Sequence, residues 1–169
     1  MMTPSTKIKH GFIAIGAVLV LGVVNTLIAH KESIKRNGDV VYLDLAPVDP
    51  RSLMQGDYMT LDFRLAREIA NSFSDTTGSM FSKPMEGESR VVAVKLDQKR
   101  VASLSANKEA LKIRYRLRDG RVWLGTNAFF FEEGKAQQYV RARYGEFRVD
   151  KDSGEAMLVG LRSEELKAL

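Results

Sequence analysis

The sequence predicts an α+β fold, in which a mostly antiparallel β domain with one or two short helices follows a single N-terminal transmembrane helix. Residues 11–29 contain no charged side chain, which is typical of a segment that crosses a bilayer. Apolar and polar residues alternate through several later segments, as in strands that bury one face. An Asp-Gly pair at residues 119–120 separates two such segments, and this combination is a strong signal for an antiparallel hairpin.

The length of the chain fits one folded domain and one anchor, because 169 residues leave enough for a single core after the apolar run. Cysteine is absent, which excludes disulfides, thiolate nucleophiles and cysteine-based zinc sites. We divide the chain into a cytoplasmic N-terminus over residues 1–10, an anchor over 11–30, a linker over 31–39 and a β-rich domain over 40–169, with a long surface loop at 74–89.

The charge of the domain gives no indication of nucleic acid binding. The whole chain carries a formal net charge of +5, but two of its lysines precede the apolar run. From Lys31 onward there are 24 basic and 21 acidic residues, a net charge of +3. Nucleic-acid-binding domains normally show a much stronger basic excess, so we expect no nucleic acid partner.

The apolar run is long enough to span a membrane. As a helix, residues 11–29 would extend about 28 Å, close to the hydrocarbon thickness of a bilayer. A cleaved signal peptide is the alternative, but its apolar part is usually shorter, and Leu27 stands where a small residue is needed before a cleavage site. We therefore expect an uncleaved anchor, with the lipid bilayer as its partner.

The charges on the two sides of the run do not fix its orientation. Lys7 and Lys9 precede it, whereas Lys31, Lys35 and Arg36 follow it, so the positive-inside count is balanced. Short basic N-termini ahead of a first apolar segment commonly stay in the cytoplasm. This tendency favours export of the long C-terminal part.

The first part of the domain is predicted to contain two strands and a short helix. Residues 40–45 are rich in β-formers, and the two prolines that follow favour an extended or turning backbone. Residues 58–63 alternate between apolar and polar side chains, and Gly56 would allow a tight entry into this half-buried strand. Apolar residues then recur at every fourth position from Leu65 to Phe73, which predicts an amphipathic helix.

The rest of the domain is predicted to consist mostly of strands. Hairpins are expected around the Asp-Gly pair and again across residues 152–154. Three consecutive phenylalanines near residue 130 predict a strand covered on both faces, and residues 136–143 have weak helical character. The strands are expected at residues 90–97, 100–104, 111–118, 121–124, 127–133, 146–150 and 155–161.

Residues 56–63 read GDYMTLDF and resemble the signature of a bacterial family that is named GDYXXLXY after this motif. Phe63 stands in place of the final tyrosine of the signature. Asp49, Pro50 and Arg51 precede the motif, as they do in members of the family.

Two later blocks of the chain are similar to the same family. One covers residues 129–136 and includes Glu133 and Gly134, and the other covers residues 147–161. Members often have proline where Glu132 stands, so the turn before Gly134 is expected to differ. From the order and spacing of the three blocks, the chain is identified as a member of the family.

The resemblance implies an architecture and a location rather than an activity. It implies a single-pass protein of the bacterial inner membrane whose C-terminal domain lies in the periplasm. Genes of the family often stand beside those of multi-pass membrane proteins, which implies an accessory subunit of a complex. We expect the motif to act in folding: Tyr58 and Leu61 would pack the first hairpin, and Gly56 would allow the turn that positions Asp57. The alternative is that the motif is a binding site.

A hydrolase with a serine and a lysine, similar to signal peptidases, is the alternative function. Ser52 would be the nucleophile and Lys95 the base, since a buried lysine can activate a serine. The proline and threonine expected after such a serine are missing, and Lys95 also fits the solvent face of a strand. The two histidines, His10 and His30, flank the apolar run, so a histidine-based triad is not expected. We expect a non-enzymatic domain.

Carboxylates in the family-like blocks provide another candidate site. Asp49, Asp57, Glu132 and Glu133 have the oxygen ligands that Ca²⁺ and Mg²⁺ prefer. Their spacing matches no known cation loop, so we assign no metal and no cofactor. The simpler interpretation is that the aspartates cap turns and the glutamates are exposed.

A basic row is the clearest candidate binding surface in the sequence. Lys112, Arg114, Arg116 and Arg118 share one face of a predicted strand, within about 20 Å. Phospholipid headgroups, a cell-wall polyanion or an acidic partner would fit this row. The alternative is a solvated strand face whose positive charge is balanced by nearby carboxylates.

Overall fold

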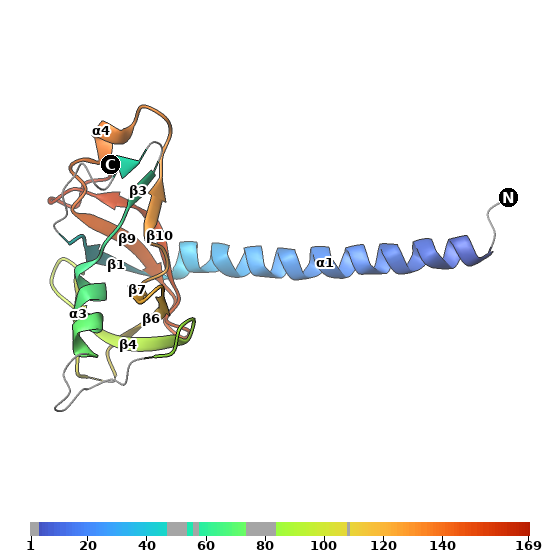
Figure 1. The fold of residues 1–169 in the computed structure, drawn as a ribbon, viewed down its shortest axis with the longest axis horizontal. Coiled ribbons are helices and arrows are strands. Elements are labelled where there is room, and N and C mark those ends of the chain that lie inside the picture. Colours follow the sequence, from blue (N-terminus) through green and yellow to red (C-terminus); the bar gives the residue numbers. More distant parts are fainter. Residues whose placement is uncertain (1–3, 47–53, 56–57, 74–83, 108) are drawn as a thin grey trace.

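The computed structural model describes residues 4–46, 54–55, 58–73, 84–107 and 109–169, and shows one long helix projecting from a β domain (Figure 1). The fold is α+β with mostly antiparallel sheets, as predicted. Its elements are α1 (Pro4–Asn37), β1 (Asp39–Asp44), β2 (Met54–Gln55), β3 (Tyr58–Thr60), α3 (Arg64–Ser72), β4 (Ser89–Leu96), β5 (Ala102–Leu104), β6 (Leu111–Arg118), β7 (Arg121–Trp123), β8 (Ala128–Phe130), α4 (Ala136–Tyr139), β9 (Tyr144–Val149) and β10 (Ala156–Arg162).

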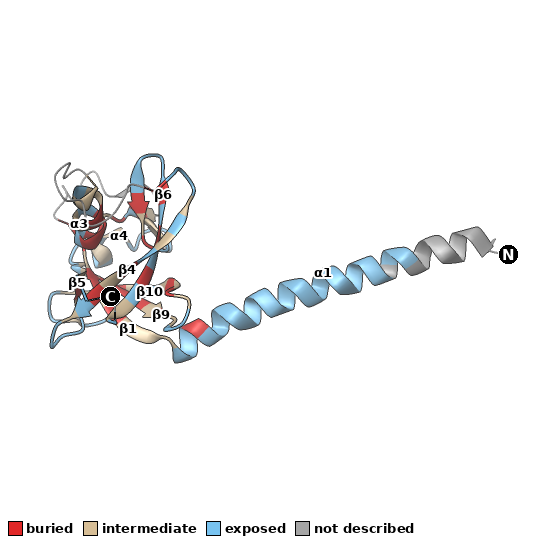
Figure 2. Cartoon of the chain, turned by 90° about the horizontal axis from the view of Figure 1, so that it is seen from below, coloured by how far each residue is buried: buried red, intermediate tan, exposed pale blue. Residues whose placement is uncertain are grey.

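The helix α1 carries the apolar run, and within the described residues it is the one helix that could span a membrane, over Ile15–Asn37. None of its apolar stretch packs against the domain, and Figure 2 shows it exposed along most of its length. Polar side chains inside the run bond to the helix itself, since the Asn25 amide donates to the Leu21 carbonyl at 3.0 Å. Such bonding lowers the cost of placing an amide in lipid.

The expected linker over residues 31–39 is wrong, because α1 continues without a break to Asn37. The reason lies in Ile34, which is only 2% exposed and packs into the domain. The backbone N–H of Gly38 donates to the Ile34 carbonyl at 2.9 Å and closes the last turn. The domain is therefore attached directly to the end of the helix, against β9 and β10.

Three small sheets form the domain. Their strand orders are β1-β9-β10, β2-β3-β8 and β5-β4-β6-β7, and the pairs within each sheet are antiparallel. The helix α3 packs against β1, β5 and β7. All three sheets contribute to one core, in which the rings of Phe63 and Phe147 meet edge to face at 5.4 Å. A hydrophobic core shared in this way makes the domain a single unit.

The alternating segments behave as the pattern predicts. In β6 the side chains of Ile113, Tyr115 and Leu117 are buried, and the basic residues between them are exposed. The hairpin from β6 to β7 turns at Asp119 and Gly120, whose φ angles are 51° and 70°. Positive φ at both central residues is the geometry that favours Asp-Gly in two-residue hairpins.

Three further expectations differ from the structure. Phe130 is 74% exposed, because Phe129 and Phe131 pack against the core and Phe130 lies on the opposite, uncovered face of β8. The helix expected at 136–143 is a single turn, α4. The loop expected at 74–89 ends before Ser89, where β4 begins, and residues 74–83 lie outside the described residues.

Candidate functional site

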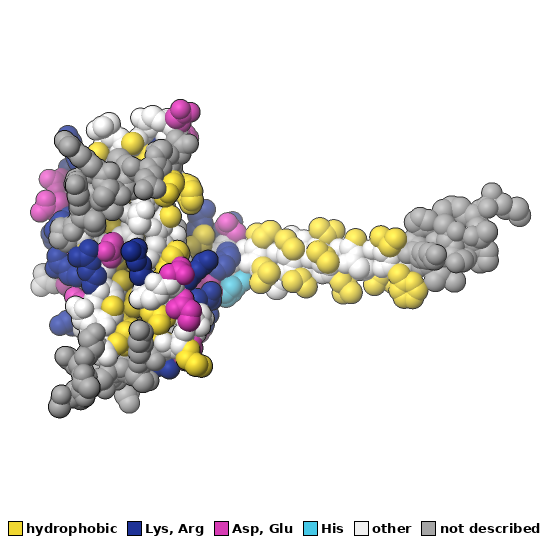
Figure 3. Space-filling model, viewed as in Figure 1, with side chains coloured by type: hydrophobic (Ala, Val, Ile, Leu, Met, Phe, Trp, Pro, Cys, Tyr) yellow, Lys and Arg dark blue, Asp and Glu magenta, His cyan; other side chains and the backbone are white. Residues whose placement is uncertain are grey.

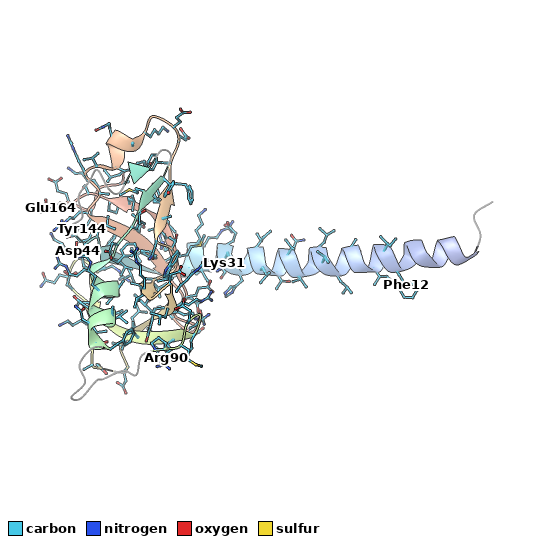
Figure 4. The ribbon with its side chains drawn as sticks, in the orientation of Figure 1. Phe12, Lys31, Asp44, Arg90, Tyr144 and Glu164 are labelled. Atoms are coloured by element: carbon cyan, nitrogen blue, oxygen red, sulfur yellow. The ribbon has the colours of Figure 1, made fainter. Side chains whose placement is uncertain are left out.

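A basic cleft lies where the long helix meets the domain. Its volume is about 290 Å³, and Figure 3 shows lysine and arginine side chains gathered at this junction. Lys31, labelled in Figure 4, stands on the helix side of the junction. The cleft is lined by Lys31, Ser89, Arg114, Arg116, Arg118, Trp123, Gly125, Glu155 and Ala156.

Three arginines of β6 reach the cleft because the strand alternation places them on one face. The Arg114 guanidinium donates to the Ser153 carbonyl at 3.0 Å, and Arg116 Nε donates to Ser89 Oγ at 3.2 Å. Arg118 lies over the Trp123 ring, 5.2 Å from its centre, in a cation-π contact. Each guanidinium is thus held by a neutral partner that leaves its charge uncompensated.

The balance of charge in the cleft is positive. Among the described residues, no carboxylate forms an ion pair with any of the three arginines or with Lys112, which shares their strand face outside the cleft. Glu155 is the one acidic residue in the lining. The structure therefore brings together three of the four residues of the predicted basic row and adds Lys31, which the sequence did not link to them.

Glu155 joins the domain to the helix. Its carboxylate accepts hydrogen bonds from Lys31 Nζ and, at 3.3 Å, lies beside His30 Nε2. The hydrogen bond from Lys31 holds the pKa of Glu155 below its ordinary value, against the opposing effect of partial burial. Among the described residues of the lining, this contact engages the one acidic side chain, so the arginines remain available to an anion.

The signature motif lies in another part of the domain. Strands β2 and β3 pair with Gln55 opposite Tyr58, so only residues 56 and 57 separate them. Leu61 is buried, and the Tyr58 ring packs on exposed Phe130 of β8 at 5.6 Å. The motif residues Asp49, Pro50, Arg51, Gly56 and Asp57 lie outside the described residues.

The second family-like block forms an exposed turn. Gly134 has φ +80°, a left-handed conformation that suits glycine, and Glu133 is exposed beside it. Glu132 pairs with Lys135 at 2.6 Å, and this hydrogen bond lowers the pKa of Glu132. The predicted exposure of both glutamates is confirmed. The turn is closed by the Lys135 backbone N–H, which donates to the Glu132 carbonyl at 3.0 Å, with Gly134 in the left-handed conformation.

An open groove of about 750 Å³ runs beside the end of the signature strand. Two of its lining residues have a buried side-chain atom without a hydrogen-bond partner in the described structure, namely Trp123 Nε1 and Asn127 Oδ1. Thr60, Leu61 and Asp62 form one wall of the groove. Sequence reasoning missed this groove, because its walls come from the motif strand, α3 and the β6–β7 hairpin, and no local pattern links them.

The other candidate residues have structural surroundings. Lys95 is exposed on β4, opposite Ser103 in the ladder, and Ser52 lies outside the described residues. The buried acid Glu146 pairs with Arg162 on the neighbouring strand. Within the described ranges, no three His, Cys, Asp or Glu side chains come together in a group that could hold a metal ion.

These features define a class of protein: a compact β-rich domain carried on one N-terminal helix that is apolar enough to span a membrane. The model of the GDYXXLXY protein family matches residues 20–161, and the chain belongs to this family. The membership predicted from the motif is thereby confirmed. Neither the curated proteins nor the solved structures include a match to the chain. Phe63 replaces the final tyrosine of the signature at a fully buried position that has room for a ring but needs no hydroxyl.

Proposed function

We propose that this protein is a non-enzymatic accessory subunit of the bacterial inner membrane, with its β domain in the periplasm, and that it binds a multi-pass membrane protein. The observation that carries the proposal is the exposed aromatic edge formed by Tyr58 and Phe130. Phe130 is 74% exposed and rests on the tyrosine of the signature motif. Large exposed aromatic side chains are the residues that most often anchor protein interfaces.

The edge position of β8 supports a docking role. In the order β2-β3-β8, one side of β8 pairs with β3, and its other side is not paired with a described strand. An unpaired strand edge can form backbone hydrogen bonds with an extended segment of another chain. Side chains beside the edge, such as Phe130, can then pack into pockets on that chain. We therefore expect the partner to present an extended apolar segment.

The position of the edge supports a partner in the same membrane. In Figure 1 strand β3, and with it the β2-β3-β8 sheet, lies to one side of the helix axis. A protein bound at this sheet would lie beside the anchor rather than beyond the domain. A multi-pass membrane protein with a short periplasmic segment fits this position, and the family resemblance implies such a neighbour.

Site-specific crosslinking tests the proposal. A photo-crosslinking amino acid at position 130, in the full chain in native membranes, should form an adduct with a multi-pass membrane protein. The same probe at Met85, which is 77% exposed elsewhere on the domain, should not. Phe130→Glu should also remove that protein from the detergent-purified complex, whereas Met85→Glu should retain it. Equal adducts at both positions, or a complex that survives Phe130→Glu, would rule out this docking surface.

A further inference from the structure

We propose that the basic cleft binds the phosphate headgroup of an anionic phospholipid in the leaflet next to the domain. The inference rests on one part of the proposed function, namely that α1 spans the bilayer, and is independent of the docking partner. It assigns a ligand class to Lys31, Arg114, Arg116 and Arg118, which line one cleft at the helix–domain junction.

The depth of the cleft agrees with headgroup binding. Lys31 follows the last residue of the uncharged run, Ala29, by two positions, which is about 3 Å along a helix. The polar layer of each leaflet is about 5 to 8 Å thick. If residues 11–29 fill the hydrocarbon core, Lys31 and the cleft it lines lie within the headgroup layer.

The domain is held at this depth by two contacts. Ile34 is buried in the domain, and the Glu155 carboxylate bonds to Lys31 and His30 on the preceding turn. Both contacts lie within about two helical turns of the end of the apolar run. The arginines of β6 consequently cannot move away from the membrane surface without breaking them.

The chemistry of the cleft matches a phosphate diester. A guanidinium donates two parallel N–H bonds to phosphate oxygens, and its planar shape is better suited to this than a lysine ammonium. Arg114 and Arg116 are already positioned by hydrogen bonds to Ser153 and Ser89, so less side-chain entropy is lost when an anion binds. They line a cleft in which the acidic side chain of Glu155 is already bonded to Lys31.

The walls of the cleft also suit a lipid. The ring of Trp123 lines it under Arg118, and tryptophan rings are enriched at the level of lipid headgroups. The volume of about 290 Å³ lies near the lower limit for ligand sites, enough for a headgroup but not for a folded polymer. Gly125 closes one side, and a Cβ there would lie 2.5 Å from the Ala156 carbonyl oxygen.

The single tryptophan of the chain provides a direct probe of the cleft. The full chain is reconstituted into phosphatidylcholine vesicles with or without phosphatidylglycerol that carries a headgroup quencher. We expect quenching of Trp123 fluorescence by the labelled phosphatidylglycerol to exceed that by equally labelled phosphatidylcholine, and salt to reduce the difference.

Two variants with equal charge loss make the test specific. The triple variant Arg114→Gln, Arg116→Gln, Arg118→Gln should lose the preference for phosphatidylglycerol, by about fivefold in binding constant per charge removed. The control replaces Lys99, Arg141 and Lys167 by glutamine. These three residues line a groove with Glu164, which lies on the side of the domain away from the helix (Figure 4). The control should keep the preference.

Three outcomes would overturn the inference. The first is an inserted protein with no preference for phosphatidylglycerol, and the second is an equal loss in both triple variants. The third is saturation of the cleft by free glycerol phosphate in the absence of anionic lipid, which would identify a soluble anion as the ligand. Failure of the chain to remain in vesicles after alkaline washing would instead contradict the membrane anchor of the proposed function, so the two failures are distinguishable.

Discussion

Replacing Ile34 by alanine should destabilise the whole domain, although Ile34 belongs to the helix that carries the apolar run. Its side chain is 2% exposed and packs into the domain just before the chain enters β1. The substitution removes three carbon atoms, which corresponds to about 2.4 kcal/mol of lost burial. The cavity left behind raises the expected cost to about 2.5 to 4 kcal/mol.

A loss of this size is a large part of the stability of a domain, which is about 5 to 15 kcal/mol. For a domain of this length it corresponds to a fall in the unfolding midpoint of about 10 °C. The assay is thermal unfolding of the full chain in mild detergent, followed by Trp123 fluorescence. The control is Ser33→Ala, because Ser33 is exposed on the same turn. Equal unfolding midpoints for the two variants would refute the packing of the end of α1 against the domain. They would support the linker expected over residues 31–39.

Four further predictions concern single residues. The pKa of Glu155 is lowered in the folded state, so its contribution to stability should be complete above the ordinary glutamate value of 4.5 and should be lost as the pH falls through the lower folded value. Comparing the unfolding midpoints of wild type and Glu155→Gln across pH measures this contribution. Parallel curves for the two proteins would contradict the prediction. Arg162→Leu should cost about 3 kcal/mol in denaturant unfolding, since it leaves the buried Glu146 carboxylate unpaired; a cost near zero would show that water reaches it. Ser52→Ala should complement the phenotype of a deletion strain as well as the wild-type protein does. Failure to complement at a normal protein level would instead support the hydrolase. Gly56→Val should lower protein abundance on immunoblots, whereas normal abundance with lost function would make the motif a binding site.

The parts of the fold that local patterns determine were predictable. The β6–β7 hairpin follows from alternation around Asp-Gly, because register and turn geometry are both set within a few residues. The last hairpin, β9 with β10, follows in the same way from the turn residues at 152–154. Family membership was predictable as well, since the motif blocks are themselves sequence patterns.

The parts that depend on distant contacts were not predictable. Ile34 is one apolar residue among polar neighbours, and only the nearby domain explains why the helix continues through it. The exposure of Phe130 depends on which face of β8 the rest of the domain covers, and the run of phenylalanines does not reveal this. The basic row of β6 was visible in the sequence, but its meeting with Lys31 in one cleft depends on how the sheets pack onto the helix.

Because α1 continues directly into the domain, the helix and the domain move as one rigid body. The helix has 34 residues, about 51 Å in length, and only Gly38, whose N–H is bonded to the Ile34 carbonyl, separates it from β1. Rotation of the helix about its axis within the bilayer must therefore turn the aromatic edge by the same angle. One residue inserted after Ala29 would rotate that edge by about 100° relative to the membrane-spanning part of the helix and raise it by about 1.5 Å. A partner that contacts both the helix and the aromatic edge could therefore bind at only one rotational position of the helix.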